Sequence, residues 1–234
     1  MTATGILSLE TLNDFLLKNK GKTVFVEHEV KSLLRNMGLP VPKGIFIDKE
    51  ARLPAMSHKL SALSYPLVAK VSSVKITSKS DVKGIRFGIK NEDELKDAVS
   101  GLMQIDNAEG VLVEEMAPQG LEVIIGGVID RQFGPIVMFG LGGVFVELFK
   151  DVAFGLAPLD KDNALWLIKQ IKGYKLLEGY RGSPPVDINA LADIIIAVSE
   201  ITATDMIKEI DLNPVALYPQ GAMILDAKLE ILMD

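Results

Sequence analysis

Strand-like segments follow one another in the middle of this chain, and their order limits the folds that it can adopt. Apolar stretches read as strands over residues 110–116, 122–130 and 133–147, the last of which is divided into two by a glycine loop. Helical patterns lie before and after these segments rather than between them. Because a doubly wound parallel sheet needs strict alternation of strand and helix, this order favours an α+β fold.

Hydrophobic spacing predicts the remaining elements. Helices are expected at residues 7–20, 27–36, 49–63, 92–103, 160–172 and 187–201, and further strands at 44–47, 65–71 and 85–89. Ser8 is a possible N-cap of the first helix, and Gly38 is placed to end the second. In the fourth helix, Leu95, Val99 and Leu102 are expected to face the core.

The end of the chain reads as a β-hairpin around a Tyr-Pro-Gln-Gly turn, with proline second and glycine fourth as a type I turn prefers. Equal spacing from the turn places Asn213 opposite Asp226 and Asp211 opposite Lys228. Glu209, Asp211 and Asn213 share one face of an extended strand. These oxygen ligands suit Mg²⁺, which keeps waters and bridges to phosphate. A half-exposed hairpin with ordinary charged pairs is the alternative.

Composition excludes several classes of function. The formal net charge is −6 and no basic stripe is present, which argues against a nucleic-acid surface. The chain has no cysteine, so disulfides, thiolate metal sites and cysteine nucleophiles are excluded. The first residues lack the basic start of a secretion signal, and the apolar runs are shorter than a membrane span. These features predict a cytoplasmic protein with no membrane partner.

One lysine, Lys70, interrupts the apolar strand expected over residues 65–71. A lysine in a buried strand must extend its ammonium group to water or meet an anion. The segment 72–84 after it is rich in small polar residues, and their backbone N–H groups can hold a phosphate. An ordinary solvated loop between two strands is the alternative.

Four segments of the chain resemble the ATP-grasp β subunit of ADP-forming acyl-CoA synthetases and, more widely, the β subunit of succinyl-CoA synthetase. They are residues 68–84, 130–151, 179–187 and 209–228. The most specific matches are Phe133-Gly134-Pro135, the Met-Phe-Gly-Leu-Gly-Gly run at 138–143 and Asp211-Leu212-Asn213-Pro214. The likeness runs in one register from residue 27 to the C-terminus.

This resemblance implies an ATP-grasp fold, in which two α+β subdomains clasp a nucleotide. It predicts an N-terminal helix within residues 1–26, an N-terminal subdomain over 27–116 with a phosphate-covering loop at 72–84, and a C-terminal subdomain over 117–234 with the metal-binding hairpin. The family's ligases reversibly convert acyl-CoA, ADP and phosphate into acid, CoA and ATP. Their CoA-binding α subunit carries a phosphohistidine, so this chain is expected to be half of an α2β2 enzyme.

The resemblance also assigns nucleotide-binding roles. Lys70 would bind the phosphates of ATP or ADP, main-chain groups around Glu114 would pair with the adenine edge, and Met116 would pack on the ring. Glu122 would accept hydrogen bonds from the ribose hydroxyls. The glutamate at 114 could otherwise simply mark a strand end facing water.

Further roles concern the metal and the transferred group. Asn213 and Asp226 would hold Mg²⁺, with Asp211 as a neighbouring or alternate ligand. Arg181 would neutralise charge on the phosphoryl group or pair with the partner, unless it is only a solvated loop residue. The glycines would let the backbone approach a phosphate or the α subunit: they are Gly140, Gly142 and Gly143. Two acidic residues lie near these glycines in the sequence, Glu147 and Asp151. Both are expected to be surface groups at strand ends, and Glu147 is also a candidate to reach the active site.

The chain departs from the family within the 72–84 loop. The family shows His-Lys-Ser-Asp followed by Gly-Gly, and that histidine is proposed to carry phosphate between distant sites. Here Ser78 stands in place of the histidine, and Lys83 replaces one glycine. A serine cannot form the labile phosphoramidate of a reversible carrier. The chain's two histidines, His28 and His58, are expected to be surface residues of helices.

Three functions therefore stand beside one another. The first is an enzyme subunit that transfers a phosphoryl group between Mg-ATP or Mg-ADP and a phosphohistidine on the α subunit, by positioning and charge neutralisation. The second is a non-catalytic or regulatory ATP-binding subunit, suggested by Ser78. The third is an ATP-grasp ligase that acts alone through an acyl phosphate.

Overall fold

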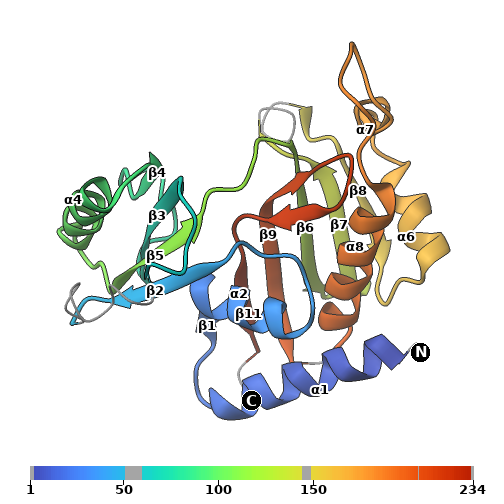
Figure 1. The fold of residues 1–234 in the computed structure, drawn as a ribbon. Coiled ribbons are helices and arrows are strands. Elements are labelled where there is room, and N and C mark those ends of the chain that lie inside the picture. The colour runs from blue at the N-terminus through green and yellow to red at the C-terminus, as the bar shows by residue number, and fades with distance from the viewer. Residues whose placement is uncertain (1–2, 51–59, 144–148, 205, 233–234) are drawn as a thin grey trace. The chain divides into compact units, whose positions relative to one another are not determined.

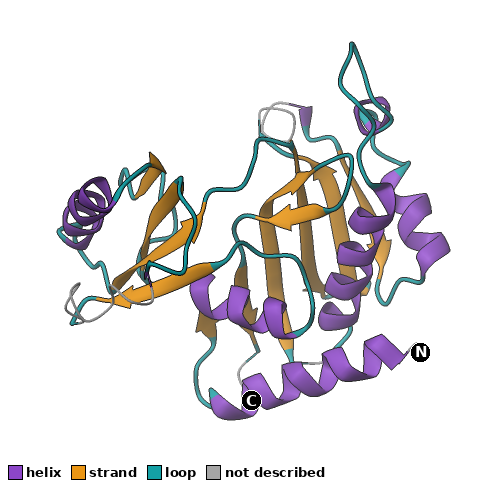
Figure 2. Ribbon diagram, in the orientation of Figure 1, coloured by secondary structure: helices purple, strands orange, loops and turns teal. Residues whose placement is uncertain are grey.

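The computed structural model describes residues 3–50, 60–143, 149–204 and 206–232 (Figure 1). The chain forms two compact units. The larger consists of Met1–Phe25, Glu29–Val41 and Gln119–Asp234, and the smaller of Val26–His28 and Pro42–Pro118. Both combine helices with antiparallel sheets, as the sequence predicts for an α+β fold (Figure 2).

The smaller unit contains a four-stranded antiparallel sheet with helix α4 (Glu92–Met103) packed against it. The strand order is β2-β5-β3-β4, for β2 (Gly44–Asp48), β3 (Leu67–Ser72), β4 (Ile85–Ile89) and β5 (Gly110–Glu115). Helix α4 buries Leu95, Val99 and Leu102, the three residues expected to face the core. The side chain of Asn91 caps this helix by accepting the amide hydrogen of Glu94.

The larger unit is built on a seven-stranded antiparallel sheet. Its order is β1-β11-β9-β6-β7-β8, and β10 also pairs with β9. The strands are β1 (Val24–Phe25), β6 (Leu121–Asp130), β7 (Gly134–Leu141), β8 (Val152–Leu156), β9 (Ile207–Leu217), β10 (Ala222–Ile224) and β11 (Lys228–Ile231). The side chains of Val137, Phe139 and Leu141 alternate into the core, which leaves the other face of β7 for half-exposed residues.

Helices cover the core face of this sheet. They are α1 (Ala3–Lys18), α2 (Glu27–Asn36), α6 (Lys161–Ile168), α7 (Tyr174–Leu177) and α8 (Ile188–Thr202). In Figure 1, α8 lies across the sheet, and it packs on β6, β7 and β9. The approach is close, because a Cβ atom at Gly127 would lie only 1.9 Å from the Thr202 hydroxyl oxygen.

Helix α2 has the predicted bounds, but most of it belongs to the larger unit. Its apolar stripe, Val30, Leu33 and Leu34, lies in the hydrophobic core of that unit. All of residues 27–116 were instead expected in one subdomain, because an amphipathic stripe does not indicate which core it enters. Gly38 ends the helix with φ of +82°, and the Leu39 amide donates to the Leu34 carbonyl as in a Schellman motif.

Other predicted elements differ from the structure at particular residues. Helix α1 begins at Ala3, so Ser8 lies inside it and the predicted N-cap is wrong. The predicted helix at 49–63 falls largely on residues 51–59, and the strand after the glycine loop falls on 144–148, which lie outside the described residues. Strand β8 and helix α7 were not predicted. Both are short, so their hydrophobic patterns are weak.

Asp151 is buried, which contradicts its expected place on the surface. Its side chain is 7% exposed, and the amide hydrogens of Lys172 and Gly173 bond to its two carboxylate oxygens, each at 2.7 Å. The aspartate therefore ties the start of β8 to the turn before α7. The other predicted surface acid, Glu147, lies outside the described residues.

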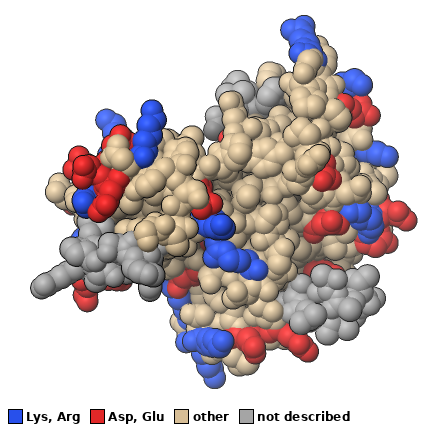
Figure 3. Space-filling view, viewed as in Figure 1, with Lys and Arg blue, Asp and Glu red and all other residues tan. Residues whose placement is uncertain are grey.

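Charged side chains of both signs are interspersed on the face in Figure 3. Among the helices described, none combines the length and the apolar character needed to cross a bilayer.

We expect Asp151→Ala to lower the free energy of unfolding by about 2–3 kcal/mol, because two amides lose a buried charged acceptor. Asp14→Ala, at an exposed position of α1, is the matched control and should change it by less than about 0.5 kcal/mol. Urea unfolding followed by circular dichroism measures both. Equal stability of the two variants would show that the Asp151 bonds do not hold this region.

Candidate functional site

Lys70 is buried in the smaller unit and lies between two carboxylates. Its ammonium nitrogen is 2.5 Å from Glu27 Oε1 and 2.9 Å from Glu114 Oε2, and the three side chains are between 1% and 9% exposed. The Lys70 ammonium group therefore meets anions inside the protein and does not extend to water. The Glu114 carboxylate is buried as well, so Glu114 is not simply a residue at a strand end that faces water.

The second oxygen of Glu27 lies 2.8 Å from the ammonium nitrogen of Lys79, which belongs to the 72–84 loop. One glutamate thus contacts a lysine of the sheet and a lysine of the loop. The four charged groups sum to zero, which reduces the cost of burying them. No local sequence pattern predicts this network, because Glu27 is far from both lysines along the chain.

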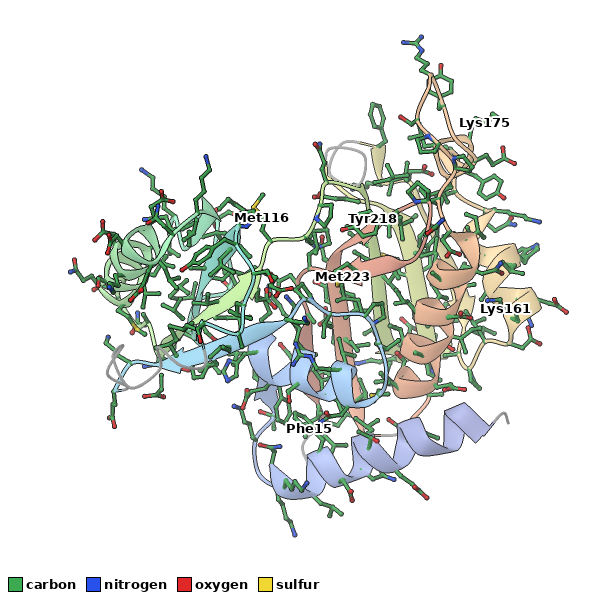
Figure 4. All side chains as sticks on the ribbon, in the orientation of Figure 1. Phe15, Met116, Lys161, Lys175, Tyr218 and Met223 are labelled. Carbon is green, nitrogen blue, oxygen red and sulfur yellow. The ribbon has the colours of Figure 1, made fainter. Side chains whose placement is uncertain are left out.

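The backbone amides of Glu115 and Met116 form hydrogen bonds within the smaller unit. The amide of Glu115 donates to Lys43 O at 2.9 Å, and the amide of Met116 donates to Pro66 O at 2.9 Å. The Met116 side chain is 41% exposed (Figure 4). That side chain is therefore the accessible part of the segment expected to contact adenine.

The 72–84 loop joins β3 to β4, and backbone hydrogen bonds close its base. The amide of Gly84 donates to Lys79 O at 2.6 Å, and the amide of Val71 donates to Gly84 O at 2.8 Å. Lys83 has φ of +50°, so it keeps the left-handed backbone that suits the glycine it replaces. Ser78 is half-buried, and the Asp81 amide donates to its hydroxyl over 3.4 Å.

His28 is not a surface residue, which corrects the sequence prediction. Its imidazole is half-buried and stacks on Phe46, with ring centroids 3.7 Å apart and planes 5° apart. Its Nδ1 lies 3.2 Å from the hydroxyl oxygen of Ser72, at the start of the loop. His58 lies outside the described residues.

The two backbone positions at the base of this loop predict opposite responses to substitution. Lys83→Gly should stabilise the smaller unit by up to about 1 kcal/mol, because it removes left-handed strain while adding some unfolded-state entropy. Gly84→Ala should destabilise it by about 1–3 kcal/mol, since a Cβ there would lie 2.4 Å from Val71 Cγ1. Hydrogen exchange of β3 amides measures both. Stabilisation by Gly84→Ala would contradict the packing seen here.

The C-terminal hairpin of the larger unit has the predicted register. Leu217 pairs with Ala222, and Asp211 pairs with Lys228. Between these pairs, the Asn213 amide donates to Asp226 O at 3.2 Å, so these two residues lie opposite each other. Tyr218 and Met223 mark the two sides of the turn in Figure 4.

Strand β9 places its polar residues on one face. Ile210 and Leu212 are buried, whereas Asp211 is half-buried and Asn213 is exposed. The pairing of β9 with β6 shifts by one residue after Leu212. Pro214 lies in this bulge, where the missing backbone N–H costs no ladder hydrogen bond.

The charges on this face favour a cation. Burial raises the pKa of Asp211 most, and the negative charges of Glu209 and Asp226 raise it further, while Lys228 lowers it. Within the described residues, no cluster of three His, Cys, Asp or Glu could hold a metal, so an amide such as Asn213 would have to contribute. Mg²⁺ commonly takes only one or two carboxylates and fills its other positions with water and phosphate. The donor set fits that requirement.

Two further residues hold the hairpin in place. Asp187 caps α8 by accepting the Ala190 amide, and its other oxygen accepts the Gly221 amide at 2.9 Å. Lys31 of α2 is 2% exposed and donates to Leu225 O at 2.8 Å, next to Asp226. Neither role was predicted from the sequence. The sequence does contain an N-cap signal at Asp187, but no local pattern predicts its hydrogen bond to the hairpin turn.

The hydrogen bonds of Asp187 to the hairpin turn should depend on pH. Amide hydrogen bonds from Ala190 and Gly221 lower its pKa, so its stabilisation is present above the ordinary aspartate pKa and is lost as the pH falls through the lowered value. Asp187→Ala should therefore cost about 1 kcal/mol at pH 7 and less at an acidic pH below the ordinary aspartate pKa. Urea unfolding at both pH values measures the difference. A cost that does not change with pH would contradict this role.

The three glycines expected at a phosphate have different surroundings. A Cβ at Gly140 would lie 2.7 Å from Asp151 O, and one at Gly142 would lie 3.1 Å from Glu122 O. Both glycines are buried and serve close strand packing. Gly143 is exposed and has φ of +60°, and no atom of the described residues lies within 4 Å of an added Cβ.

The remaining predicted residues are exposed. The Glu122 side chain is exposed, and its backbone carbonyl accepts the Gly142 amide at 2.8 Å, so the two predicted residues lie side by side. Arg181 has φ of +48° and its guanidinium lies 5.3 Å from the centre of the Tyr180 ring. A cleft of about 420 Å³ lies between this loop and the hairpin turn, and its lining includes Tyr180 and Tyr218 but none of the predicted site residues.

Comparison with known proteins gives consistent matches along the chain. Residues 17–231 match the family model described as an ATP-grasp domain. The β subunit of acetate–CoA ligase (ADP-forming) I from Pyrococcus furiosus is 45% identical over 215 residues, which cover 87% of this chain and 90% of the relative. Acetate–CoA ligase (ADP-forming) II from Archaeoglobus fulgidus is 40% identical over 208 residues, which cover 89% of this chain but 30% of the relative.

A solved structure is similar over the same region. It is the dinucleotide-forming acetyl-coenzyme A synthetase 1 of Ca. Korarchaeum cryptofilum in complex with coenzyme A and Mg-AMPPCP, with its phosphohistidine segment pointing towards the nucleotide-binding site. The TM-score is 0.79 at 39% identity, with coverage of 98% of this chain and 100% of that chain. The chain thus spans about a third of a long single-chain relative and nearly all of the shorter subunits.

Proposed function

This chain belongs to the ATP-grasp family, and from that premise we propose that it is the nucleotide-binding β subunit of an ADP-forming acyl-CoA synthetase. The predicted α+β ATP-grasp fold and the predicted likeness to β subunits of ADP-forming acetate–CoA ligases are confirmed. The reaction would convert acyl-CoA, ADP and phosphate reversibly into the free acid, CoA and ATP.

One observation carries this proposal, namely the 45% identity to a β subunit of an ADP-forming acetate–CoA ligase over 90% of that subunit. Because that relative is a subunit, we propose that the rest of the enzyme is a partner chain. We assign to it the CoA-binding domain and the phosphohistidine, and we propose an α2β2 assembly. The lone ligase predicts no such partner and is therefore less well supported.

The smaller unit would bind the nucleotide through its own groups. Lys70 would contact the phosphates, the 72–84 loop would cover them, and the exposed Met116 side chain would pack on the adenine. Phosphoryl transfer asks the protein mainly for positioning and for neutralisation of charge on the transferred group. A buried lysine that already meets carboxylates is held in a fixed position for that task.

The larger unit would supply the metal ligands and further contacts. Asn213 and Asp226 would hold Mg²⁺, with Asp211 beside them, and Glu122 would accept hydrogen bonds from the ribose. When bound, Mg²⁺ supplies positive charge to the phosphate oxygens. Gly143 is better suited than Gly140 or Gly142 to bring its amide to a phosphate, since only its surroundings are open. Exposed Arg181 would neutralise phosphoryl charge or pair with the partner chain.

The non-catalytic alternative is not favoured. It rests on Ser78, but the relatives that match along this chain are named as ligases and ligase subunits. Loss of the loop histidine therefore affects how phosphate travels within the enzyme rather than whether the chain belongs to one.

The metal assignment is tested with Asp226→Ala in complex with the α-type partner chain. We expect phosphorylation of the partner histidine from ATP, measured as acid-labile label, to fall by about 100-fold or more at limiting Mg²⁺, because a carboxylate ligand is lost. The stability of the chain should stay close to that of the parent, since Asp226 is only half-buried.

Glu230→Gln is the matched control, because Glu230 is on the same hairpin and forms a partly exposed ion pair with Lys208 at 2.7 Å. It should label the partner at the parental rate. Parental labelling by Asp226→Ala would remove the metal assignment. Tight ATP binding by the parent complex with no acid-labile label on either chain would instead support the non-catalytic alternative.

A further inference from the structure

Glu27 is the centre of a buried charge network that the roles above do not include. Its two oxygens lie 2.5 Å from Lys70 Nζ and 2.8 Å from Lys79 Nζ. The Glu27 side chain is 2% exposed, and those of Lys70 and Lys79 are 9% and 12% exposed. Two ammonium groups are therefore gathered on one carboxylate, largely away from water.

Lys79 connects this network to the backbone of the loop. Its carbonyl accepts the Gly84 amide at 2.6 Å, and the Gly84 carbonyl accepts the Val71 amide at 2.8 Å. The side chain of Lys79 is thus held by Glu27, and its backbone is held by the base of the loop. A shift of the Glu27 carboxylate would be passed on to the loop.

The arrangement has a chemical consequence for anion binding. Two ammonium groups this close repel each other unless an anion lies between them. Glu27 supplies that anion and so holds the two ammonium groups near each other, and Glu114 adds a second charge beside Lys70 at 2.9 Å. A diphosphate has several charged oxygens and can engage two lysines at once, whereas a monophosphate offers fewer.

We propose that Lys79 is a second phosphate-binding lysine beside Lys70, and that Glu27 is a positioning residue that holds both ammonium groups and fastens the 72–84 loop. The inference rests on the proposed function, because it takes Lys70 as the contact to the nucleotide phosphates. The proposal also names the part of the nucleotide that Lys79 recognises, which is the second phosphate group.

Calorimetric titration of the full chain, in complex with its partner where one co-purifies, tests Lys79. Lys79→Met should weaken ADP binding by about 10-fold or more, the loss expected for a charge-assisted hydrogen bond, and AMP binding by less than about 2-fold. Lys79→Arg keeps the charge and should recover most of the ADP affinity. Lys96→Met, at an exposed position of α4 in the same unit, should leave both affinities unchanged.

Hydrogen exchange of the same proteins tests Glu27. Glu27→Gln keeps the shape of the side chain but not its charge, so the Gly84 amide should exchange at least about 10-fold faster and ADP affinity should fall more than AMP affinity. Glu29→Gln is the control on the same helix, since Glu29 pairs with Lys22 at 2.6 Å instead. It should alter neither measurement.

The outcomes separate this inference from the proposed function. Parental ADP affinity in Lys79→Met, or equal losses for ADP and AMP, would overturn the role of Lys79. Unchanged exchange at Gly84 in Glu27→Gln would overturn the role of Glu27. Failure of the parent protein to bind either nucleotide would refute the proposed function itself, whatever the variants do.

Discussion

The smaller unit depends on a lysine that is buried in a central strand and must be compensated. Lys70 is on β3, and Glu114 on the neighbouring strand β5 lies diagonally across from it on the same face, because Val68 pairs with Glu114 and Lys70 pairs with Leu112. Gly44 on β2 pairs with Glu114, and a Cβ there would lie 2.7 Å from Glu114 Cγ. Three adjacent strands thus share in the placement of one ion pair. Removal of Lys70 would take away a cation that compensates two buried carboxylates, which is far more costly than the loss of an exposed pair.

The larger unit differs from the smaller one, because the polar residues of its C-terminal hairpin are accessible although their backbone positions are fixed. The core residues of β9 anchor the strand, and the bulge at Pro214 sets the path of the chain beside Asn213. Asp187 from α8 and Lys31 from α2 hold the opposite side of the hairpin through backbone groups. The candidate ligands themselves carry little of the packing. Rigid support behind accessible oxygens is what a metal site needs, because the metal demands defined geometry.

The sequence predicted local features well and long-range ones poorly. The hairpin register followed from the turn and from equal spacing, and the core face of α4 followed from the spacing of its leucines and valine. Glu27 and Lys70 could not be paired from the sequence, since only the sheet and the start of α2 bring them together. Asp151 was taken for a surface acid because its burial depends on amides about twenty residues later. Gly140 was interpreted as a phosphate contact, although its lack of a side chain serves the approach of β8.

The loop after β3 shows what a departure from a family pattern does and does not change. Lys83 replaces a glycine, yet it keeps a positive φ, so the backbone course survives the substitution at some cost in strain. Ser78 stands where the family pattern has a histidine, and a serine hydroxyl cannot form a labile phosphoramidate. The neighbouring Lys79 is held by a buried carboxylate. The loop therefore presents a positioned lysine but no group suited to carry phosphate at residue 78. A loop in that condition can still cover and neutralise phosphates at a fixed position, but any transfer over a distance must depend on a group outside it.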